Sequence, residues 1–151
     1  THAVAGIVAT AAAFAAADAG RAAEVARVSA LRYRMVAGLT AFDRVSGTVP
    51  TAATVPGIVH VCVEGAESEA LLYLLDEGGV CAAAGSACAA GALEPSHVLA
   101  AMGVPEARAA GALRFSLGHT TSAADVDRAV DVVADTVARL GGTRVPHGVP
   151  A

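Results

Sequence analysis

Lysine and tryptophan are both missing from this sequence of 151 residues, and aromatic side chains are few, with three Phe and two Tyr. Without a lysine amine, the chain has no side chain of the usual kind for holding a carbonyl compound as a Schiff base. So few rings also make the base-stacking platforms of single-strand-binding proteins hard to build. The ten basic residues are all arginines, scattered rather than clustered, and the net charge is −4. The sequence therefore carries no electrostatic footprint for nucleic acid.

Cysteine is sparse as well, and its three positions, Cys62, Cys81 and Cys88, contain no Cys-x-x-Cys pair. An odd number of cysteines without such a pair indicates neither a disulfide framework nor a zinc ribbon. We therefore expect a reducing, cytoplasmic setting. His60 and Cys62 lie two residues apart on one face of an expected strand and could ligate a metal, but no second pair nearby completes a tetrahedral site.

Charge is absent from the stretch between Ala3 and Ala17, which is largely alanine. The stretch has no basic leader of the kind that signal peptides carry, and it is too short to span a bilayer. We therefore expect a buried helix here and no membrane segment. The charged residues that follow are expected to form only a solvated face of the same helix: Arg21, Glu24, Arg27, Arg32 and Arg34.

Hydrophobic periodicity indicates a mixture of helices and strands. Helical patterns cover residues 4–39, 67–77, 94–103 and 122–140, and Gly20 is a point where the first helix could break. Gly78-Gly79 is expected to end the second helix, and Ser122 with Asp125 forms a capping-box-like signal at the start of the last. Strand patterns cover residues 45–48, 58–63, 80–83 and 112–117. This order predicts an α/β (α+β) fold with one small sheet covered by helices. A chain of this length fits one domain, placed at residues 1–140, and the Gly- and Pro-rich residues 141–151 are expected to be a flexible tail.

The same patterns predict where several side chains lie. Cys62, inside a strand pattern, and Cys81, at the start of another, are expected to be packed and inert. In the helix over residues 94–103, the residues expected to face inward are Val98, Leu99 and Met102.

The stretch Gly85-Ser86-Ala87-Cys88 is where chemistry is best sought. The neighbours of Cys88 are too small to bury its thiol, which favours an accessible loop and a reactive thiolate. The helix expected to follow could add a modest dipole effect in favour of the thiolate. On local composition alone, the alternative that Cys88 is a small buried hydrophobe stays open.

Three blocks of sequence occur in a distinctive order: Ala84-Gly85-Ser86-Ala87-Cys88, then Leu93-Glu94-Pro95-Ser96-His97-Val98-Leu99, then Leu113-Arg114-Phe115-Ser116-Leu117-Gly118. Together they closely resemble the C-terminal region of cysteine desulfurases, the pyridoxal-phosphate enzymes that take sulfur from L-cysteine. The resemblance reaches back to Thr1 and covers about residues 1 to 140. It implies the small C-terminal domain of a fold-type I pyridoxal-phosphate enzyme, of the kind that serves iron–sulfur cluster assembly.

The resemblance implies roles for three residues. Cys88 resembles the catalytic nucleophile that receives the sulfur as a persulfide. Arg114 resembles the residue that binds the substrate carboxylate, a task suited to the bidentate guanidinium fork; without the motif, a surface arginine would be the favoured interpretation. Thr1 resembles the residue that donates to the cofactor phosphate across a dimer interface. The lysine that holds pyridoxal 5'-phosphate in the family, and the large domain that carries it, are not in this sequence.

The resemblance also implies L-cysteine as substrate, L-alanine as product, a sulfur-acceptor protein such as an iron–sulfur scaffold as partner, and a cytoplasmic homodimer. Neither nucleic acid nor a membrane is an expected partner. The sequence departs from the family pattern at Ala83, Ala84, Ala89 and Ala90, where small hydroxyl residues are common, and at His119, where arginine is usual. These changes alter the hydrogen bonding of the Cys88 loop and the local charge.

Two hypotheses of different classes follow. In the first, the chain is part of a cysteine desulfurase and depends on a large domain that it does not contain. In the second, it is a non-catalytic stand-alone small domain that acts as a sulfur acceptor or a docking module. A third and weaker hypothesis is a small metal or redox protein that uses Cys62, Cys81, Cys88 and a histidine.

Overall fold

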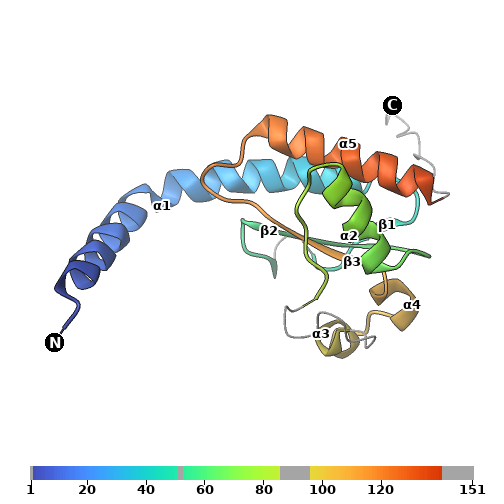
Figure 1. Cartoon of the computed structure of the whole chain (residues 1–151), viewed down its shortest axis with the longest axis horizontal. Coiled ribbons are helices and arrows are strands. Elements are labelled where there is room, and N and C mark those ends of the chain that lie inside the picture. The colour runs from blue at the N-terminus through green and yellow to red at the C-terminus, as the bar shows by residue number, and fades with distance from the viewer. Residues whose placement is uncertain (1, 51–52, 86–95, 141–151) are drawn as a thin grey trace.

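A computed structural model defines residues 2–50, 53–85 and 96–140 of the chain (Figure 1). Its elements, in chain order, are α1 (Val4–Leu39), β1 (Val45–Gly47), β2 (Ile58–Val63), α2 (Ser68–Glu77), α3 (His97–Ala101), α4 (Glu106–Ala109), β3 (Ala112–Ser116) and α5 (Ala123–Arg139). Helices pack on one small sheet, which confirms the predicted α/β architecture. Residues 141–151 lie outside the described residues, so the division into a domain at 1–140 and a flexible tail stays a prediction.

The three named strands form an antiparallel sheet in the order β1-β2-β3. Val45 pairs with Val63 at one end of β1, and His60 of β2 pairs with Arg114 of β3. The predicted strand over residues 80–83 is wrong in extent. Only Ala83 joins the sheet, through an isolated antiparallel bridge to Arg114.

Alternation along the strands gives the sheet two different faces. The inner face carries Val59, Val61 and Phe115 into the main core, where the C-terminal part of α1 and α5 cover it. The outer face carries Cys62 and Ala112 at one end, in the small cluster beneath α3 and α4. Further along, the same face carries His60, Arg114 and Ser116. We call the side with these last residues the outer face throughout.

Only the second half of α1 is packed. Its buried residues begin at Val28, and the helix before that point projects away from the rest of the chain (Figure 1). Val4, Ile7 and Phe14 are 60–75% exposed. The expectation of a buried helix over Ala3–Ala17 is therefore wrong, because a run of alanines has a helical pattern whether or not anything covers it.

The predicted break at Gly20 is also not observed, since α1 runs unbroken for 36 residues. In length and composition this helix resembles a segment that could cross a membrane, although core helices of soluble proteins and signal sequences pass the same test. It is the one such helix among the residues that the structure describes.

The arginines of α1 are more than a solvated face. Arg32 is buried, and its Nε donates to the carbonyl of Ile58 at 3.0 Å. Arg34 pairs with Asp127 of α5, with Nη2 2.7 Å from Oδ2. Arg27 donates to the carbonyls of the loop that follows β3, including that of Thr121 at 2.7 Å. These three side chains therefore fasten α1 to the sheet and to α5.

Two helices end as the sequence predicts. α5 begins with a capping box in which Asp125 N donates to Ser122 Oγ at 3.2 Å and Ser122 N donates to Asp125 Oδ2 at 2.8 Å. α2 ends at a glycine pair whose second member, Gly79, has φ of 75°, a conformation that favours glycine.

The helix predicted over residues 94–103 is shorter than expected in the described part, because α3 has five residues. Of its apolar residues only Leu99 is buried, whereas Val98 and Met102 are 53% and 47% exposed. The expectation that all three face inward is therefore wrong for two of them.

Candidate active site

Arg114 occupies the middle of β3 and is exposed on the outer face of the sheet. Its backbone N–H donates to Ala83 O at 2.7 Å, and its carbonyl accepts from Ala83 N at 3.0 Å. Because these groups point toward Ala83, Arg114 and His60 form a non-hydrogen-bonded pair across β2 and β3. Residues opposite each other in such pairs have Cα atoms only about 4.5 Å apart, with adjacent side chains. The sheet therefore brings His60 and Arg114 together.

The Ala83 bridge also locates the start of the predicted Cys88 loop. The chain leaves the sheet at Ala83 and passes through Gly85, whose φ of 66° belongs to the left-handed region. Cys88 itself lies outside the described residues, as do Ser86 and Ala87. In the sequence, Cys88 follows Ala83 by five residues. The thiol thus belongs to a segment that starts beside Arg114.

His60 is half-buried and is held from the opposite side by Thr48. Thr48 Oγ1 and His60 Nδ1 share a hydrogen bond at 2.8 Å, whose direction depends on the imidazole tautomer. Thr48 N also donates to the His60 carbonyl at 3.3 Å. Burial, and then the nearby positive charge of Arg114, lower the pKa of His60 below its ordinary value of 6.5. A neutral imidazole therefore lies beside the Arg114 guanidinium at neutral pH.

Arg114 differs from every other arginine that the structure describes. Three of the others, Arg21, Arg34 and Arg139, pair with a carboxylate. Arg27 bonds both a carboxylate and backbone carbonyls. The arginines that bond only backbone carbonyls are Arg32, Arg44, Arg108 and Arg128.

Among the described residues, the Arg114 guanidinium alone has no carboxylate or carbonyl acceptor. Burying or binding an arginine charge generally requires such an acceptor, and a planar carboxylate matches two of its N–H groups at once. An exposed guanidinium whose paired N–H donors have no acceptor is therefore suited to bind a carboxylate from outside the chain.

The cysteines that the structure describes differ in environment. Cys62 is fully buried, and burial raises the pKa of its thiol. Cys81 is exposed, so the expectation that it is packed is wrong. Its predicted strand does not form, and the side chain lies beside β3 and α5 in a hollow of about 190 Å³. Cys62 lies on the outer face, two residues from His60, but it is enclosed in the cluster beneath α3 and α4.

A metal centre has no support in the part of the chain that the structure describes. No group of three or more His, Cys, Asp or Glu side chains gathers there in a way that could hold an ion. His60 and Cys62 do lie on one face as predicted, but Cys62 is enclosed with Leu99 and Ala112. Thr1, the residue expected to contact a cofactor phosphate, lies outside the described residues.

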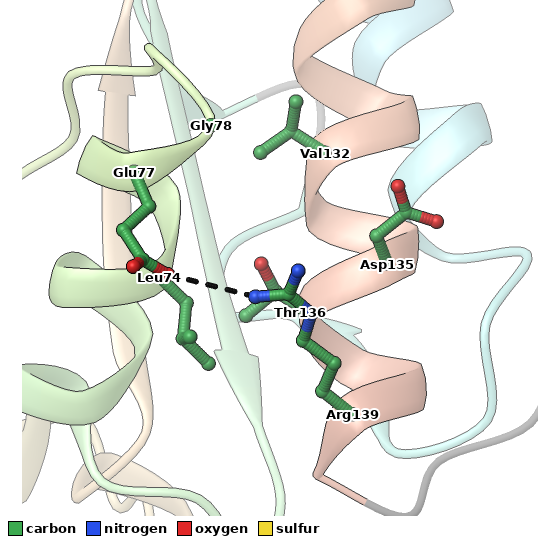
Figure 2. A pocket seen from close by; sticks show the side chains of 7 residues that line it. All are labelled: Leu74, Glu77, Gly78, Val132, Asp135, Thr136 and Arg139. Carbon is green, nitrogen blue, oxygen red and sulfur yellow. Dashed lines mark ion pairs between the residues drawn. The ribbon is translucent and has the colours of Figure 1, made fainter.

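A second hollow lies on the other side of the molecule, between α2 and α5 (Figure 2). Figure 2 shows Arg139 reaching across it to Glu77, and the two charged groups are 3.5 Å apart. Val132 and Thr136 form part of the α5 wall. The hollow contains none of the residues that the sequence singled out, and two of its three charged side chains, Glu77 and Arg139, are paired with each other.

The fit of a pyridoxal cofactor to this chain can be judged from its side chains. Lysine is absent from the sequence, so no residue here can supply the amine that holds such a cofactor covalently. What the described residues offer is a site for an anion, on the outer face. The motif in the sequence indicated Arg114, whose role stays a prediction, and His60 was weighed there only as a metal ligand. The alternation of β2 shows which face of the strand His60 lies on. Only the register with β3 shows that Arg114 lies opposite it.

In a comparison with known protein families, residues 1–129 match the model described as Aminotransferase class-V. Among curated proteins, the chain is 44% identical over 120 residues to a cysteine desulfurase of Gluconacetobacter diazotrophicus, which covers 78% of this chain. It is 47% identical over 116 residues to an IscS-like cysteine desulfurase of Mycobacterium tuberculosis, which covers 76% of this chain. The chain spans about 30% of the length of both relatives.

Solved structures with the same fold include a NifS-like protein with a TM-score of 0.78 and 25% identity. The match covers 92% of this chain and 35% of the NifS-like chain. A NifS-like protein from Rickettsia africae has a TM-score of 0.69 and 21% identity, and it covers 79% of this chain and 30% of its own. The second likeness concerns the fold alone.

Proposed function

The chain belongs to the class-V aminotransferase family, and we propose that it forms the C-terminal part of a cysteine desulfurase. Such an enzyme transfers the sulfur of L-cysteine to a protein thiol and releases L-alanine. Pyridoxal phosphate, when bound, supplies the electron withdrawal that this reaction needs. Because this chain has no lysine, the residue that holds the cofactor belongs to a separate large domain.

The observation that carries the proposal is the open guanidinium of Arg114. It is the one arginine among the described residues without an acceptor on the chain, and it is exposed beside the start of the Cys88 segment. The substrate carboxylate supplies the two acceptors that the fork lacks. Arg114 is thus the proposed anchor for one end of L-cysteine.

Cys88 is the proposed acceptor of the sulfur. Its thiolate forms a bond to the substrate sulfur while the bond between that sulfur and the substrate β-carbon breaks. The electron pair of the broken bond stays with the carbon, which takes up a proton and becomes the methyl group of alanine. The enzyme keeps a persulfide on Cys88. This role draws support from the sequence motif and from the short chain distance between Cys88 and the Ala83 bridge.

The remaining roles are proposals of the same kind. Thr1 contributes to binding of the cofactor phosphate, and the active form is a homodimer in the cytoplasm. The persulfide passes to an acceptor protein of iron–sulfur cluster assembly. A stand-alone sulfur acceptor or docking module is the second candidate function, and the absence of lysine is the observation that favours it.

Kinetics of the enzyme assembled from this chain and its large domain test the role of Arg114. We expect Arg114→Ala to raise KM for L-cysteine by about 30-fold or more, because removing one partner of a buried charge pair costs about 2–5 kcal/mol. Arg114→Lys should restore little, since a point charge lacks the fork. Arg139→Ala, which removes the exposed pair with Glu77 in Figure 2, is the matched control and should leave KM unchanged. Near-normal kinetics in both Arg114 variants would contradict the assignment.

Peptide mapping of the trapped persulfide tests the role of Cys88. After a turnover with L-cysteine, the extra sulfur should be found on Cys88 and on neither Cys62 nor Cys81. Cys88→Ser should keep cofactor binding and lose persulfide formation, because a hydroxyl cannot replace the thiolate as acceptor. A persulfide mapped to another cysteine would refute the role.

Alanine release separates the two candidate functions, and borohydride reduction tests the argument from the missing lysine. Incubated with pyridoxal phosphate and borohydride, the 151-residue chain by itself should yield no reduced adduct on an internal residue, since it has no lysine. Together with the large domain it should release alanine from L-cysteine. Failure of that combination to release alanine would favour the stand-alone module.

A further inference from the structure

Arg114 has two lateral neighbours of very different size on the outer face. On one side lies His60, its partner in β2, and on the other lies Ala83, its partner in the isolated bridge. Along β3, the neighbours on the same face are the small residues Ala112 and Ser116. Cross-strand partners are the residues that limit each other's side chains in a sheet. Of these four neighbours, His60 alone has a large side chain, and it lies directly opposite Arg114.

His60 is itself held in place, unlike a surface histidine. The hydrogen bond between its Nδ1 and Thr48 Oγ1, at 2.8 Å, fixes the imidazole ring from the side away from Arg114. The ring is half-buried, and the backbone carbonyl of His60 accepts a hydrogen bond from Thr48 N at 3.3 Å. A ring held in one orientation can sterically restrict the rotamers of a longer side chain that packs against it.

Such a steric restriction matters for Arg114, because no other group in the described chain orients its guanidinium. Arginine has many rotamers, and the entropy lost when they are fixed opposes binding unless it has been lost beforehand. The other described arginines are directed by their own carboxylates or carbonyls. Any such partner for Arg114 would compete with an incoming carboxylate, whereas an uncharged imidazole does not.

We propose that His60 is a positioning residue for Arg114: the imidazole, braced by Thr48, restricts the directions open to the guanidinium and keeps its fork ready for a substrate carboxylate. This inference rests on the proposed function, in which Arg114 binds the carboxylate of L-cysteine. His60 contributes no bond to the sulfur chemistry. Its effect reaches the reaction only through Arg114.

Steady-state kinetics of the assembled enzyme test the inference. Immobilising one flexible side chain beforehand is worth a factor of about three to ten in binding, so His60→Ala should raise KM for L-cysteine by about that much and leave kcat nearly unchanged. His60→Asn should recover part of the loss, because a planar amide can still bond Thr48. Tyr73→Ala, which removes an exposed ring on α2, is the control and should behave as the wild type.

A double-mutant cycle shows whether the effect passes through Arg114. In an Arg114→Ala background, adding His60→Ala should raise KM no further, because the side chain that it positions is gone. Equal effects of His60→Ala in both backgrounds would overturn the inference while leaving the role of Arg114 intact. An Arg114→Ala variant with normal kinetics would overturn the proposed function and this inference together.

Side-chain dynamics of the 151-residue chain give a readout that needs no cofactor. The heteronuclear NOE of the Arg114 Nε–H group should fall in His60→Ala and be intermediate in His60→Asn. The Nε–H group of Arg21, on the projecting part of α1, provides an internal reference that neither variant should change. Thermal melts confirm that the variants are folded. An unchanged NOE at Arg114 in folded His60→Ala would overturn the inference.

Discussion

The buried Nε of Arg32, in α1, donates at 3.0 Å to the backbone carbonyl of Ile58, the residue that begins β2. This bond joins the long helix to the strand that carries His60. The inner-face contacts of α1 are otherwise apolar, so Arg32 supplies a directional contact that sets where β2 starts. The bond therefore ties α1 to β2 at a point two residues from His60.

Replacing Arg32 should therefore lower the stability of the fold. We expect Arg32→Ala to reduce the free energy of unfolding by about 1–3 kcal/mol, because it leaves the Ile58 carbonyl without a charged donor. Arg21→Ala is the matched control, since the Arg21 pair with Asp18 is highly exposed and such pairs contribute little. Urea denaturation of both variants measures the difference. Equal losses in the two variants would mean that the bond from Arg32 to Ile58 adds nothing measurable to the free energy of unfolding.

The capping box of α5 gives a second prediction. Ser122→Ala removes the side-chain acceptor for Asp125 N and should cost about 1 kcal/mol of stability. Ser122→Asp should keep most of the stability that the cap provides, because aspartate is also a good N-cap residue. Thr10→Ala on the exposed part of α1, where the hydroxyl only bonds a carbonyl within its own helix, should be nearly neutral. Thermal melts of the three variants would reveal a cap effect as a loss confined to Ser122→Ala.

His60 predicts a pH dependence of stability whose sign follows from its pKa. The folded-state pKa lies below the ordinary value of 6.5, so the folded protein binds fewer protons than the unfolded chain in that window. The contribution of neutral His60 is fully present above pH 6.5 and is lost as the pH falls through the folded pKa. His60→Asn should flatten this part of the stability profile. The comparison is a series of urea melts between pH 7.5 and 5, and parallel profiles for wild type and variant would contradict the prediction.

The two described cysteines should differ in reactivity. In a Cys88→Ala background, maleimide should label exposed Cys81 quickly and buried Cys62 at least about 100-fold more slowly, because modification of Cys62 requires local opening. Mass spectrometry at timed intervals, after digestion with a protease that cleaves after glutamate and so places Cys62 and Cys81 in different peptides, measures both rates. In urea the two rates should converge, which serves as the control. Comparable rates in the folded chain would mean that the cluster around Cys62 opens readily.

Several elements could be predicted from the sequence because one local pattern determines each of them. The bounds of β2 match the alternation of Ile58–Val63, and the start of α5 follows from the Ser122 and Asp125 pair. The α/β architecture follows from the order of such patterns. Arg114 was singled out because its motif is contiguous in the sequence, and its role stays a prediction.

Other features depend on contacts between distant segments, which no local pattern contains. Burial of Arg32 requires Ile58 to lie next to it, 26 residues away. The side of Arg114 on which His60 lies depends on strand register. Cys81 is exposed because its segment pairs with β3 only at Ala83. α4, with four residues after Pro105, is too short for its periodicity to be recognised.

The uneven burial of α1 means that one continuous helix has two different stabilities. From Val28 onward its amide hydrogens are protected by the core, so they should exchange with solvent only when the whole fold opens. Before that point the helix depends on alanine propensity and on a first turn already formed by its packed half, which spares it the unfavourable nucleation step. Deuterium uptake should therefore rise steadily from Val28 back toward Val4. The folded body thus serves as a template on which the projecting half of α1 assembles, and the order of that half reports on the integrity of the core.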